Sequence, residues 1–363
     1  MDNLNGMRAI VKRNPSPGIH HEEVRRPESG LKEIVVKVRG AGVCGTDLHI
    51  YDWDKSINGR MILPRVIGHE ITGEIVEVGE GVTRLKKGDL ISAESHIVCG
   101  TCSLCRRGEA HLCKNTKILG IDVDGGFAEY VKIPEENAWK IPLSPFDKGG
   151  NKGGFPLEVS AVLEPFGNAV HAVLIEEIRG KSIAVFGCGP IGLFAIGIAK
   201  ASGASSIFAI ETRNYRLNLA ETMGASRVYD PRKWDVIREI LRETEGEGVD
   251  VILEMSGHPD AIHQGLKILT PGGRFTAFGL PNQFIHLNLS EEIIFKGIRI
   301  FGIIGRRLPE TWNTTFDLLT GGSEGSPVLD IRPIITHTYS MREFDQAIQL
   351  IKSGESGKVI LIP

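Results

Sequence analysis

Alternating hydrophobic and polar residues characterise the first third of the chain. Residues 34–39, 73–78 and 127–132 each change polarity from one position to the next, as strands with one buried face do. Glycines interrupt the pattern at turn positions, namely Gly79, Gly81, Gly88, Gly125 and Gly126. We therefore expect residues 7–131 to form strands and turns, arranged as a compact antiparallel barrel.

A different pattern begins near residue 183, where a short apolar segment is followed by glycines and a longer apolar segment. Residues 183–186 are predicted to form a strand, and a helix is predicted from the glycines to about Ser202. The alternation continues downstream, with predicted helices at 215–223, 234–243 and 259–269, and strands at 207–210, 249–255, 274–278 and within 293–304. This order predicts a doubly wound parallel sheet with right-handed crossovers.

The end of the chain returns to the first kind of structure, with a predicted helix at 341–352 and a strand at 359–362. A length of 363 residues exceeds what one hydrophobic core usually serves. We expect a discontinuous first domain of residues 1–160 and 306–363, with a second domain at 161–305 between its two parts. The stretch 142–156 is rich in glycine and proline and is predicted to be an exposed loop near the boundary. We assign no function to its glycine-rich part, 148–154.

Composition narrows the classes of partner. The net charge is −3 and the pI is near 6.4, values that predict neither a nucleic-acid nor an anionic-membrane partner. Residues 182–199 are uncharged and long enough to suggest a membrane span. Gly187, Gly189, Pro190 and Gly192 break this run, so a buried strand and helix explain it better. The N-terminal residues lack the basic and apolar pattern of a secretion signal, and we expect a cytoplasmic protein.

Four of the six cysteines crowd into residues 99–113, a spacing typical of a metal site and not of a disulfide framework. Four thiolates make a closed tetrahedral zinc site, which is structural because no position remains for substrate. A zinc ribbon for nucleic acid is the alternative, but basic flanking residues are few and no aromatic stacking platform accompanies them. The predicted structural lobe covers 97–115, with ligands Cys99, Cys102, Cys105 and Cys113.

Cys44, His69 and Glu70 are candidates for a second metal site. One thiolate, one imidazole and one carboxylate are the ligand types of a catalytic zinc, which keeps its fourth position open for water or substrate. Thr46 and His49 lie close by in the sequence, and a hydroxyl followed by an imidazole suits the transfer of a proton to solvent. A lone cysteine is more often a small buried apolar residue, so the prediction depends on the whole group.

Gly187, Gly189 and Gly192 stand between a predicted strand and a predicted helix. The first allows the tight turn, the second lets the backbone approach a pyrophosphate, and the third lets the helix pack on the strand. Glu211 ends the next predicted strand, where an acid can accept hydrogen bonds from the adenosine ribose of NAD. The alternative for Glu211 is an exposed strand end without function.

Glu164 precedes Pro165, a residue that suits the first turn of a helix. An acid at this position can simply stabilise the helix N-terminus. The residues alone leave open whether Glu164 has a further role.

With both zinc patterns and the nucleotide motif, the chain resembles the zinc-containing medium-chain alcohol dehydrogenases over its whole length. The resemblance implies an NAD-dependent zinc alcohol dehydrogenase of α/β class, with a GroES-like β-barrel catalytic domain and a Rossmann doubly wound parallel-sheet domain. It implies two Zn²⁺ ions per chain and a homotetramer. It also places Thr46 and His49 in a proton relay, and Glu164 beside the catalytic metal. The further NAD contacts that it implies are Ile191, Arg216, Phe278, Gly279, Leu280, Ile303 and Ile304.

A narrower resemblance rests on residues 44–53, 164–171, 305–307 with 310–312, and 333–337. These segments are similar to those of family members that oxidise the secondary hydroxyl of L-threonine to 2-amino-3-oxobutanoate in threonine catabolism. Two alternatives stay open: a dehydrogenase of polyols or other secondary alcohols, such as sorbitol or butanediol, and a non-catalytic NAD-binding sensor.

Overall fold

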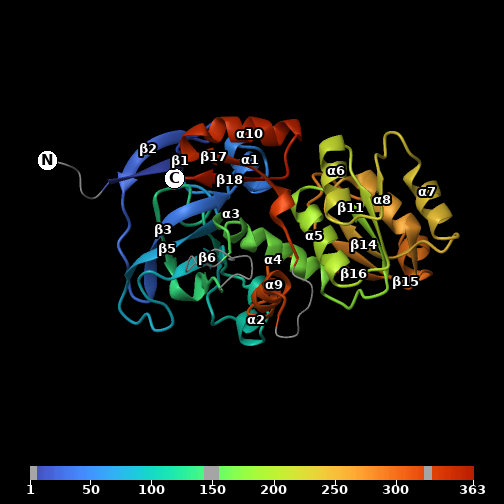
Figure 1. Cartoon of the computed structure of the whole chain (residues 1–363), viewed down its shortest axis with the longest axis horizontal. Helices are drawn as coiled ribbons and strands as arrows, with labels where there is room; N and C mark the ends of the chain where they lie inside the picture. Colours follow the sequence, from blue (N-terminus) through green and yellow to red (C-terminus); the bar gives the residue numbers. More distant parts are fainter. Residues whose placement is uncertain (1–5, 143–154, 323–328) are drawn as a thin grey trace. The chain divides into compact units, whose positions relative to one another are not determined.

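The computed structural model describes residues 6–142, 155–322 and 329–363, so most of the predicted loop 142–156, including its glycine-rich part 148–154, lies outside the described residues. The chain divides into two compact units (Figure 1). The first unit consists of Met1–Glu164, Ile335–Lys352 and Lys358–Pro363, and the second of Pro165–Ile334 and Ser353–Gly357. Across the described part of the chain, every helix is too short or too polar to cross a membrane.

A seven-stranded sheet forms the centre of the first unit. Its middle strand, β3 (Glu33–Gly42), pairs antiparallel with three others, which is why its apolar residues are buried. The sheet order is β10 (Ala138–Lys140), β6 (Leu90–Ala93), β5 (Glu70–Val78), β3, β18 (Lys358–Ile362) and β17 (Ile335–Ser340), with β9 (Tyr130–Pro134) pairing with β3. A three-stranded sheet contains β2 (His20–Arg25), β1 (Gly6–Lys12) and β4 (Arg65–Val66). The antiparallel strands predicted for the first part of the chain are confirmed.

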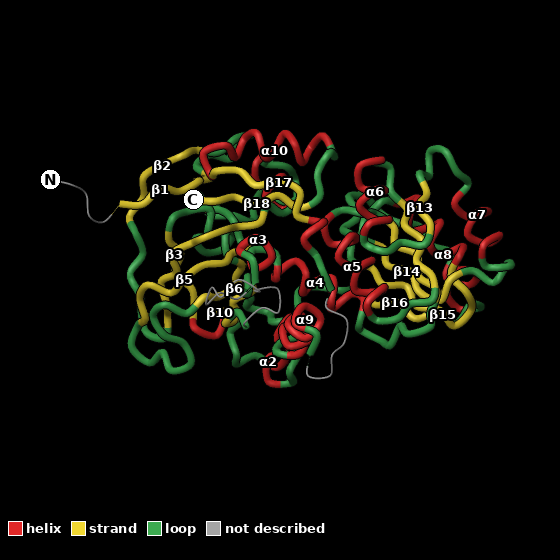
Figure 2. The backbone as a smooth tube through the Cα atoms, in the orientation of Figure 1, coloured by secondary structure: helices red, strands yellow, loops and turns green. Residues whose placement is uncertain are grey.

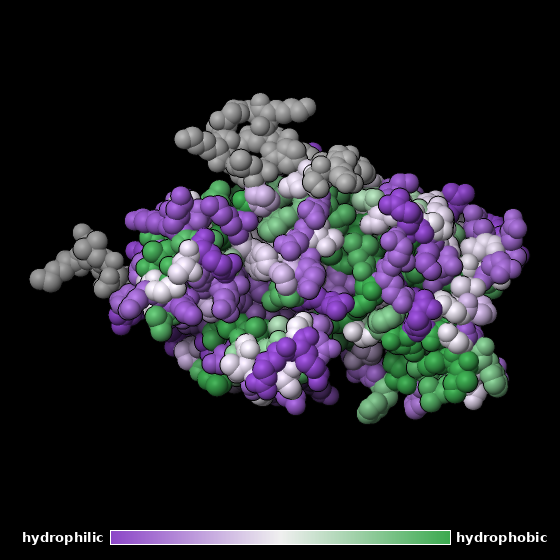
Figure 3. Space-filling view, turned by 90° about the horizontal axis from the view of Figure 1, so that it is seen from below, coloured by the Kyte–Doolittle hydropathy of each residue, from purple (hydrophilic) through white to green (hydrophobic). Residues whose placement is uncertain are grey.

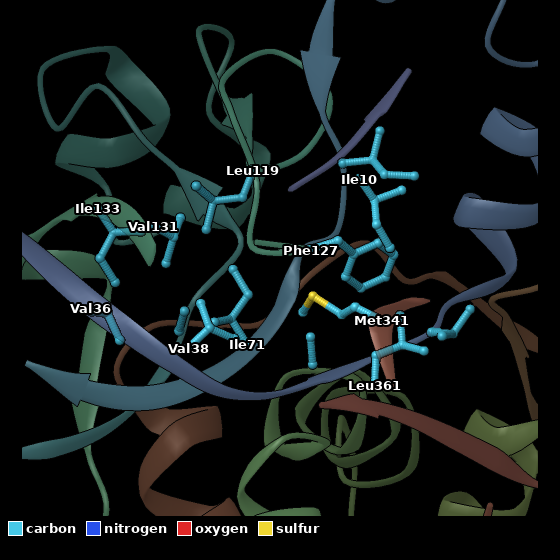
Figure 4. Close-up of a cluster of buried hydrophobic side chains, with 14 of the residues drawn as sticks. Ile10, Val36, Val38, Ile71, Leu119, Phe127, Val131, Ile133, Met341 and Leu361 are labelled. Carbon is cyan, nitrogen blue, oxygen red and sulfur yellow. The ribbon is translucent and has the colours of Figure 1, made fainter. Parts of the chain in front are cut away.

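The core of this unit joins residues from both ends of the chain. Figure 4 shows Phe127 grouped with Ile71, Met341 and Leu361. The ring of Phe127 lies 5.5 Å from that of Phe344, the first residue of α10 (Phe344–Ser353). Burial of these apolar groups fixes the C-terminal segment onto the N-terminal sheet. The predicted helix and strand near the C-terminus are confirmed, although residues 341–343 form a 3-10 turn before α10.

Helical segments interrupt the region that we predicted to contain only strands and turns, so that prediction is wrong for residues 45–52 and for two shorter segments of the cysteine-rich lobe. The helix α1 (Gly45–Asp52) begins after Cys44, whose N–H donates to the Asp47 carboxylate at 2.8 Å. It ends at Trp53, which adopts a left-handed conformation. Reciprocal capping stabilises a short helix that lacks an apolar face, which explains why periodicity did not reveal it. Two shorter helical turns, α2 (Ser103–Arg106) and Ala110–Leu112, lie in the cysteine-rich lobe between β7 (His96–Ile97) and β8 (Lys117–Ile118).

The second unit contains a six-stranded sheet in which all neighbours are parallel. Its order is β13 (Arg227–Tyr229), β12 (Ser206–Ile210), β11 (Ser182–Phe186), β14 (Val249–Glu254), β15 (Leu269–Ala277) and β16 (Arg299–Gly302). Numbered within the unit this is 3-2-1-4-5-6, the order of a dinucleotide-binding Rossmann fold. The predicted doubly wound sheet is confirmed.

Helices lie on both sides of these strands, as Figure 2 shows. They are α5 (Pro190–Ala201), α6 (Asn214–Thr222), α7 (Val236–Glu243) and α8 (Pro259–Ile268), each within two residues of its predicted bounds. The segment 293–304 differs from prediction, because residues Leu289–Ile294 form a π-helical turn and only Arg299–Gly302 are extended. The Asn288 side chain accepts a hydrogen bond from the Glu291 N–H and starts this turn.

The second unit extends further along the chain than the sequence indicated. We expected residues 306–334 in the first domain, but they belong to the second unit. This segment contains α9 (Glu310–Thr320). Arg306 and Thr311 pack against Gly167 of α4 (Leu163–Val173) so closely that a Cβ at Gly167 would lie 2.8 Å from Arg306 Cδ. This interior contact holds the segment on the second unit.

Candidate metal and nucleotide sites

Cys44, His69 and Glu70 converge in the first unit, with their ligand atoms within 4.8 Å of one another. Cys44 precedes α1, and His69 and Glu70 stand at the start of β5. The pairing of β3 with β5 sets Gly42 opposite Glu70, and a Cβ at Gly42 would lie 2.0 Å from Glu70 Oε2. The absence of a side chain at position 42 therefore makes room for the Glu70 carboxylate.

The polar atoms of this cluster suit a bound cation. His69 is 7% exposed and its Nδ1 has no hydrogen-bond partner, while Asp47 Oδ1 lies 3.8 Å away. Burial lowers the pKa of His69, but the charges of Cys44 and Asp47 raise it further, to about 10. Burial raises the pKa of Asp47. The charges of Cys44 and Asp47 thus act on a buried imidazole, and the set of thiolate, imidazole and carboxylate fits a divalent metal bound by Cys44, His69 and Glu70.

Lys358 is a member of this cluster that the sequence did not reveal. Its Nζ donates to Glu70 Oε1 at 2.6 Å and to the Val43 carbonyl at 2.8 Å, and it lies 2.5 Å from Glu70 Oε2. Both side chains are buried. Residues 70 and 358 are far apart in the chain and meet because β18 pairs with β3 beside β5.

The predicted catalytic residues lie at different places around the cluster. Thr46 Oγ1 is 3.8 Å from Cys44 Sγ, whereas His49 is 54% exposed and its Nδ1 lies 2.5 Å from Asp54 Oδ2. Within the described residues, no hydrogen bond joins Thr46 to His49. The pKa of Asp54 is lowered to about 2. The hydrogen bond from the Ser56 hydroxyl is the largest cause, burial acts in the opposite direction, and the hydrogen bond with His49 lowers the pKa further.

Glu164 is buried and close enough for its charge to act on His69 and Glu70, although it does not belong to the three-residue ligand group. The Ser95 hydroxyl donates to Glu164 Oε1 at 2.5 Å. Ser95 is also buried, so this hydrogen bond fixes the position of the carboxylate in the interior of the unit. Ser95 was not singled out in the sequence, and nothing local marks it.

The four lobe cysteines form the second group of possible metal ligands. Sulfur–sulfur distances are 3.5 Å for Cys102–Cys105, 3.9 Å for Cys102–Cys113 and 3.5 Å for Cys113–Cys99. Zinc–sulfur bonds of about 2.3 Å in a tetrahedron require sulfur separations of roughly 3.8 Å. None of the six cysteines, all of them described, forms a disulfide.

Main-chain N–H groups favour thiolates in the lobe. The N–H groups of Thr101 and Cys102 lower the pKa of Cys99 to about 5. Burial, followed by the neighbouring thiols, raises the pKa of Cys105 to about 12. The four sulfurs cannot all be anionic at neutral pH without a cation between them. The set fits a closed four-thiolate zinc site.

The three glycines of the nucleotide motif have separate structural roles. Gly187 has a φ of +90°, and a Cβ there would meet Ser256. A Cβ at Gly192 would lie 2.0 Å from the Gly187 carbonyl oxygen. Gly189 precedes α5, and a Cβ there would meet no atom within 4 Å. The open space at Gly189, at the N-terminus of a twelve-residue helix, fits a pyrophosphate.

Glu211 lies at the carboxyl end of β12 and is tied to the glycine turn. Its Oε2 accepts from the Cys188 N–H at 3.0 Å, and its Oε1 accepts from the N–H groups of Thr212 and Arg213 at 2.6 and 3.0 Å. Arg216 donates through Nε to the Ser356 carbonyl at 3.2 Å. The carboxylate is therefore held where a ribose is expected.

The remaining predicted cofactor residues share the same edge of the sheet. Phe278, Gly279 and Leu280 follow β15, and Ile303 and Ile304 follow β16, so all lie beyond the carboxyl ends of parallel strands. Leu280 is 92% exposed and Ile304 is 54% exposed, whereas Ile303 is buried. Ile191 is in the first turn of α5. Nucleotides bind at this edge in open parallel sheets.

Glu254, at the end of β14, is a buried acid at this edge that the sequence analysis did not identify. Its carboxylate accepts from the N–H groups of Ser256 at 2.9 Å and Gly257 at 3.0 Å. Burial raises its pKa. Its main-chain oxygen accepts from Phe278 and Gly279, so Glu254 shapes the loops that flank the expected cofactor position.

Comparison with known proteins defines the family. Residues 30–143 match the alcohol dehydrogenase GroES-like domain, and residues 190–321 match the zinc-binding dehydrogenase domain. The chain belongs to the zinc-binding alcohol dehydrogenase family.

Individual relatives show which members of the family the chain is similar to. An L-threonine 3-dehydrogenase from Caldanaerobacter subterraneus subsp. tengcongensis is 46% identical over 363 residues, which is 100% of both chains. Among solved structures, a zinc-binding dehydrogenase from Sinorhizobium meliloti 1021 bound to NADP has a TM-score of 0.87 at 28% identity, covering 99% of this chain and 100% of its own. A protein described as a short chain alcohol dehydrogenase, from E. coli CFT073 and complexed with NADH, has a TM-score of 0.86 at 26% identity. The match covers 99% of this chain and 100% of that chain.

Proposed function

We propose that this chain oxidises the secondary hydroxyl of L-threonine to 2-amino-3-oxobutanoate, with NAD as the hydride acceptor. The observation that carries the proposal is the group of Cys44, His69 and Glu70, of which the last two are buried, because a zinc ion with three protein ligands keeps its fourth position for substrate. Full-length similarity to an L-threonine 3-dehydrogenase at 46% identity supports the choice of substrate. In this proposal the first unit carries out catalysis and the second binds the nucleotide.

Two zinc ions per chain are part of the proposal. Cys99, Cys102, Cys105 and Cys113 would hold one ion that stabilises the lobe, while Cys44, His69 and Glu70 would hold the other. When bound at the second site, zinc supplies positive charge that polarises a hydroxyl and lowers its pKa. Glu164 stands beside these ligands, held by Ser95, and adds negative charge near the reacting group.

The chain's own residues would carry the proton away. Thr46 is placed beside Cys44, next to the expected substrate hydroxyl. His49 is exposed and can exchange protons with solvent, and Asp54 orients its ring through Nδ1. Because no hydrogen bond joins Thr46 to His49 among the described residues, a hydroxyl or water is required to bridge them.

NAD would lie along the edge formed by the glycine turn and by the loops after β12, β15 and β16. Glu211 would accept hydrogen bonds from the ribose hydroxyls, and the open position at Gly189 would admit the pyrophosphate. Arg216, Ile191, the backbone of 278–280 and Ile303–Ile304 would complete the contacts.

A substrate panel tests this function. Metal-replete protein is incubated with NAD and L-threonine, sorbitol or 2,3-butanediol, and NADH formation is followed by ultraviolet absorbance. We expect the highest kcat/KM with L-threonine. Preference for sorbitol or butanediol would identify a polyol or secondary-alcohol dehydrogenase, and no turnover with any alcohol would favour the NAD-binding sensor.

We further propose that the protein is a cytoplasmic homotetramer. Six unpaired cysteines are consistent with a reducing compartment. Residues 280–300 of the second unit expose large apolar side chains, and Figure 3 shows an apolar area on the side of this unit. They are Leu280, Phe284, Leu289, Ile294 and Phe295, together with Ile300 in the edge strand β16. A second copy of the chain would cover them. Sedimentation of the wild-type protein and of Phe295→Glu tests this, since a wild-type monomer would contradict it.

A further inference from the structure

We infer that Lys358 is a positioning residue that competes with the bound metal for the carboxylate of Glu70 and thereby keeps this ligand weakly held. The inference deepens the proposed function, because it depends on a metal at Cys44, His69 and Glu70. It assigns to the C-terminal strand β18 a part in the behaviour of a metal site built from residues near the N-terminus.

The ammonium group of Lys358 contacts a carboxylate and a main-chain carbonyl. Its ammonium group lies 2.6 Å from Glu70 Oε1 and 2.5 Å from Oε2, so both carboxylate oxygens face it. A third contact, 2.8 Å to the Val43 carbonyl, reaches the peptide group that immediately precedes Cys44. One side chain therefore touches the backbone beside one metal ligand and the carboxylate of another.

The surrounding sheet prevents either partner from leaving. Lys358 is 2% exposed and Glu70 is fully buried, so the ammonium cannot swing into solvent without opening the interior. A Cβ at Gly42 would lie 2.0 Å from Glu70 Oε2 and 3.0 Å from Lys358 Cε, which places the pair directly over a glycine. Because β3 pairs with both β5 and β18, the sheet itself sets the separation of the two groups.

The consequence for the ligand follows from charge. A buried carboxylate is stabilised by any cation that it contacts, and one shared between an ammonium and a metal donates less to the metal than one that serves the metal alone. The charge of Lys358 also acts on Cys44, but near that residue its ammonium group contacts the Val43 carbonyl, whereas it contacts both carboxylate oxygens of Glu70. Glu70 is therefore the ligand whose bond to the metal is weakened by the protein itself.

The rate of zinc release after substitution of Lys358 distinguishes this role from a purely structural one, because the two roles predict changes in opposite directions. In Lys358→Met, Glu70 loses its ammonium partner and has the metal as its remaining counter-charge, so zinc should leave the site more slowly. Outer-shell residues change metal affinity by roughly 10–100-fold, and we expect zinc release to a chromogenic chelator to slow by about 10-fold or more. Lys358→Arg keeps the positive charge and should release zinc at a rate near that of the wild type. If Lys358 only supported the fold, its loss would loosen the site and speed release.

Lys12→Met is the matched control. Lys12 is also fully buried in the first unit, but its ammonium group donates to main-chain carbonyls, those of Ser16, Gly18 and Tyr51, and lies 5.3 Å from the centre of the Trp53 ring. Its removal should leave the release rate unchanged. The zinc held by the four lobe cysteines serves as an internal standard in every variant, since its release should not depend on Lys358.

Cobalt substitution provides a second readout. The visible d–d bands of Co²⁺ in the site should shift in Lys358→Met, because the strength of Glu70 as a ligand changes, and should stay in place in Lys12→Met. Equal or faster zinc release together with unshifted cobalt bands in Lys358→Met would overturn the inference. If Lys358→Met does not fold, Lys358→Gln removes the charge but retains a donor for the Val43 carbonyl, and the same outcomes apply. Wild-type protein that binds no second metal would instead contradict the proposed function.

Discussion

The main-chain N–H of Cys188 donates a hydrogen bond to Glu211 Oε2 at 3.0 Å. Residue 188 belongs to the glycine turn after β11, and residue 211 follows β12, so the bond links the two segments expected to hold the pyrophosphate and the ribose. The other carboxylate oxygen accepts from Thr212 and Arg213. The position of this negative charge is therefore fixed before any cofactor binds.

The fixed charge predicts a preference for NAD. A 2′-phosphate placed beside Glu211 would be repelled by the carboxylate, and we expect kcat/KM for NAD to exceed that for NADP by roughly 10²-fold or more. Glu211→Ser should narrow the ratio, because it removes the repulsion and leaves Arg213 and Arg216 available. The same variant should also raise KM for NAD, since the Cys188 N–H loses its acceptor. Equal efficiency with the two cofactors in the unmodified protein would mean that the arginines dominate this site.

His49→Gln should lower turnover with little effect on NAD affinity. Glutamine retains a hydrogen-bonding side chain but cannot take up a proton, and general acid–base groups contribute about 10²-fold or more. We expect the loss to be largest at pH values below the plateau of the wild-type profile. His20→Gln is a suitable control, because His20 is an exposed histidine of β2 in the same unit. An equal loss in NAD affinity, or unaltered turnover, would argue against a relay role.

Ser95→Ala tests whether Glu164 must be held in place. Without the hydroxyl, the buried carboxylate loses a donor at 2.5 Å and can reorient, so we expect kcat to fall by about 10-fold while KM for NAD stays the same. Ser92→Ala is the matched control, since Ser92 is equally buried and its hydroxyl has no hydrogen-bond partner. Similar kinetics for the two variants would show that the Ser95 bond does not support catalysis.

The parts of the fold that repeat a simple pattern were predictable from sequence. The strands at 183–186 and 207–210 lie within one residue of β11 and β12, because continuous apolar runs bounded by glycines are typical of buried parallel strands. The helix α1 was not predicted, because its stability depends on the capping bond from Cys44 to Asp47 and not on an apolar face. The domain to which residues 306–334 belong depends on the packing of Arg306 beside Gly167, a contact that no local pattern indicates.

The candidate site also contains some residues that could be predicted from the sequence and others that could not. Cys44, His69 and Glu70 are close in sequence and could be proposed from residue type alone, and the structure brings them together. Lys358 and Ser95 could not be proposed, because each meets its acidic partner only through sheet pairing or packing of distant segments. Their residue types are common, so only the folded arrangement distinguishes them from ordinary lysines and serines.

We propose that L-threonine oxidation takes place at a metal held by Cys44, His69 and Glu70. Selective removal of this metal is the most direct test. The site with three protein ligands should lose zinc to a mild chelator sooner than the closed four-cysteine site. We therefore measure zinc content, circular dichroism and NADH formation from L-threonine in the same samples, before chelation, after chelation and after zinc is returned. We expect about two zinc ions per active chain, loss of activity with about one ion and the fold retained, and recovery of activity when zinc is returned. One zinc in the fully active protein, simultaneous loss of both ions, or undiminished threonine oxidation after the first ion has left would contradict it.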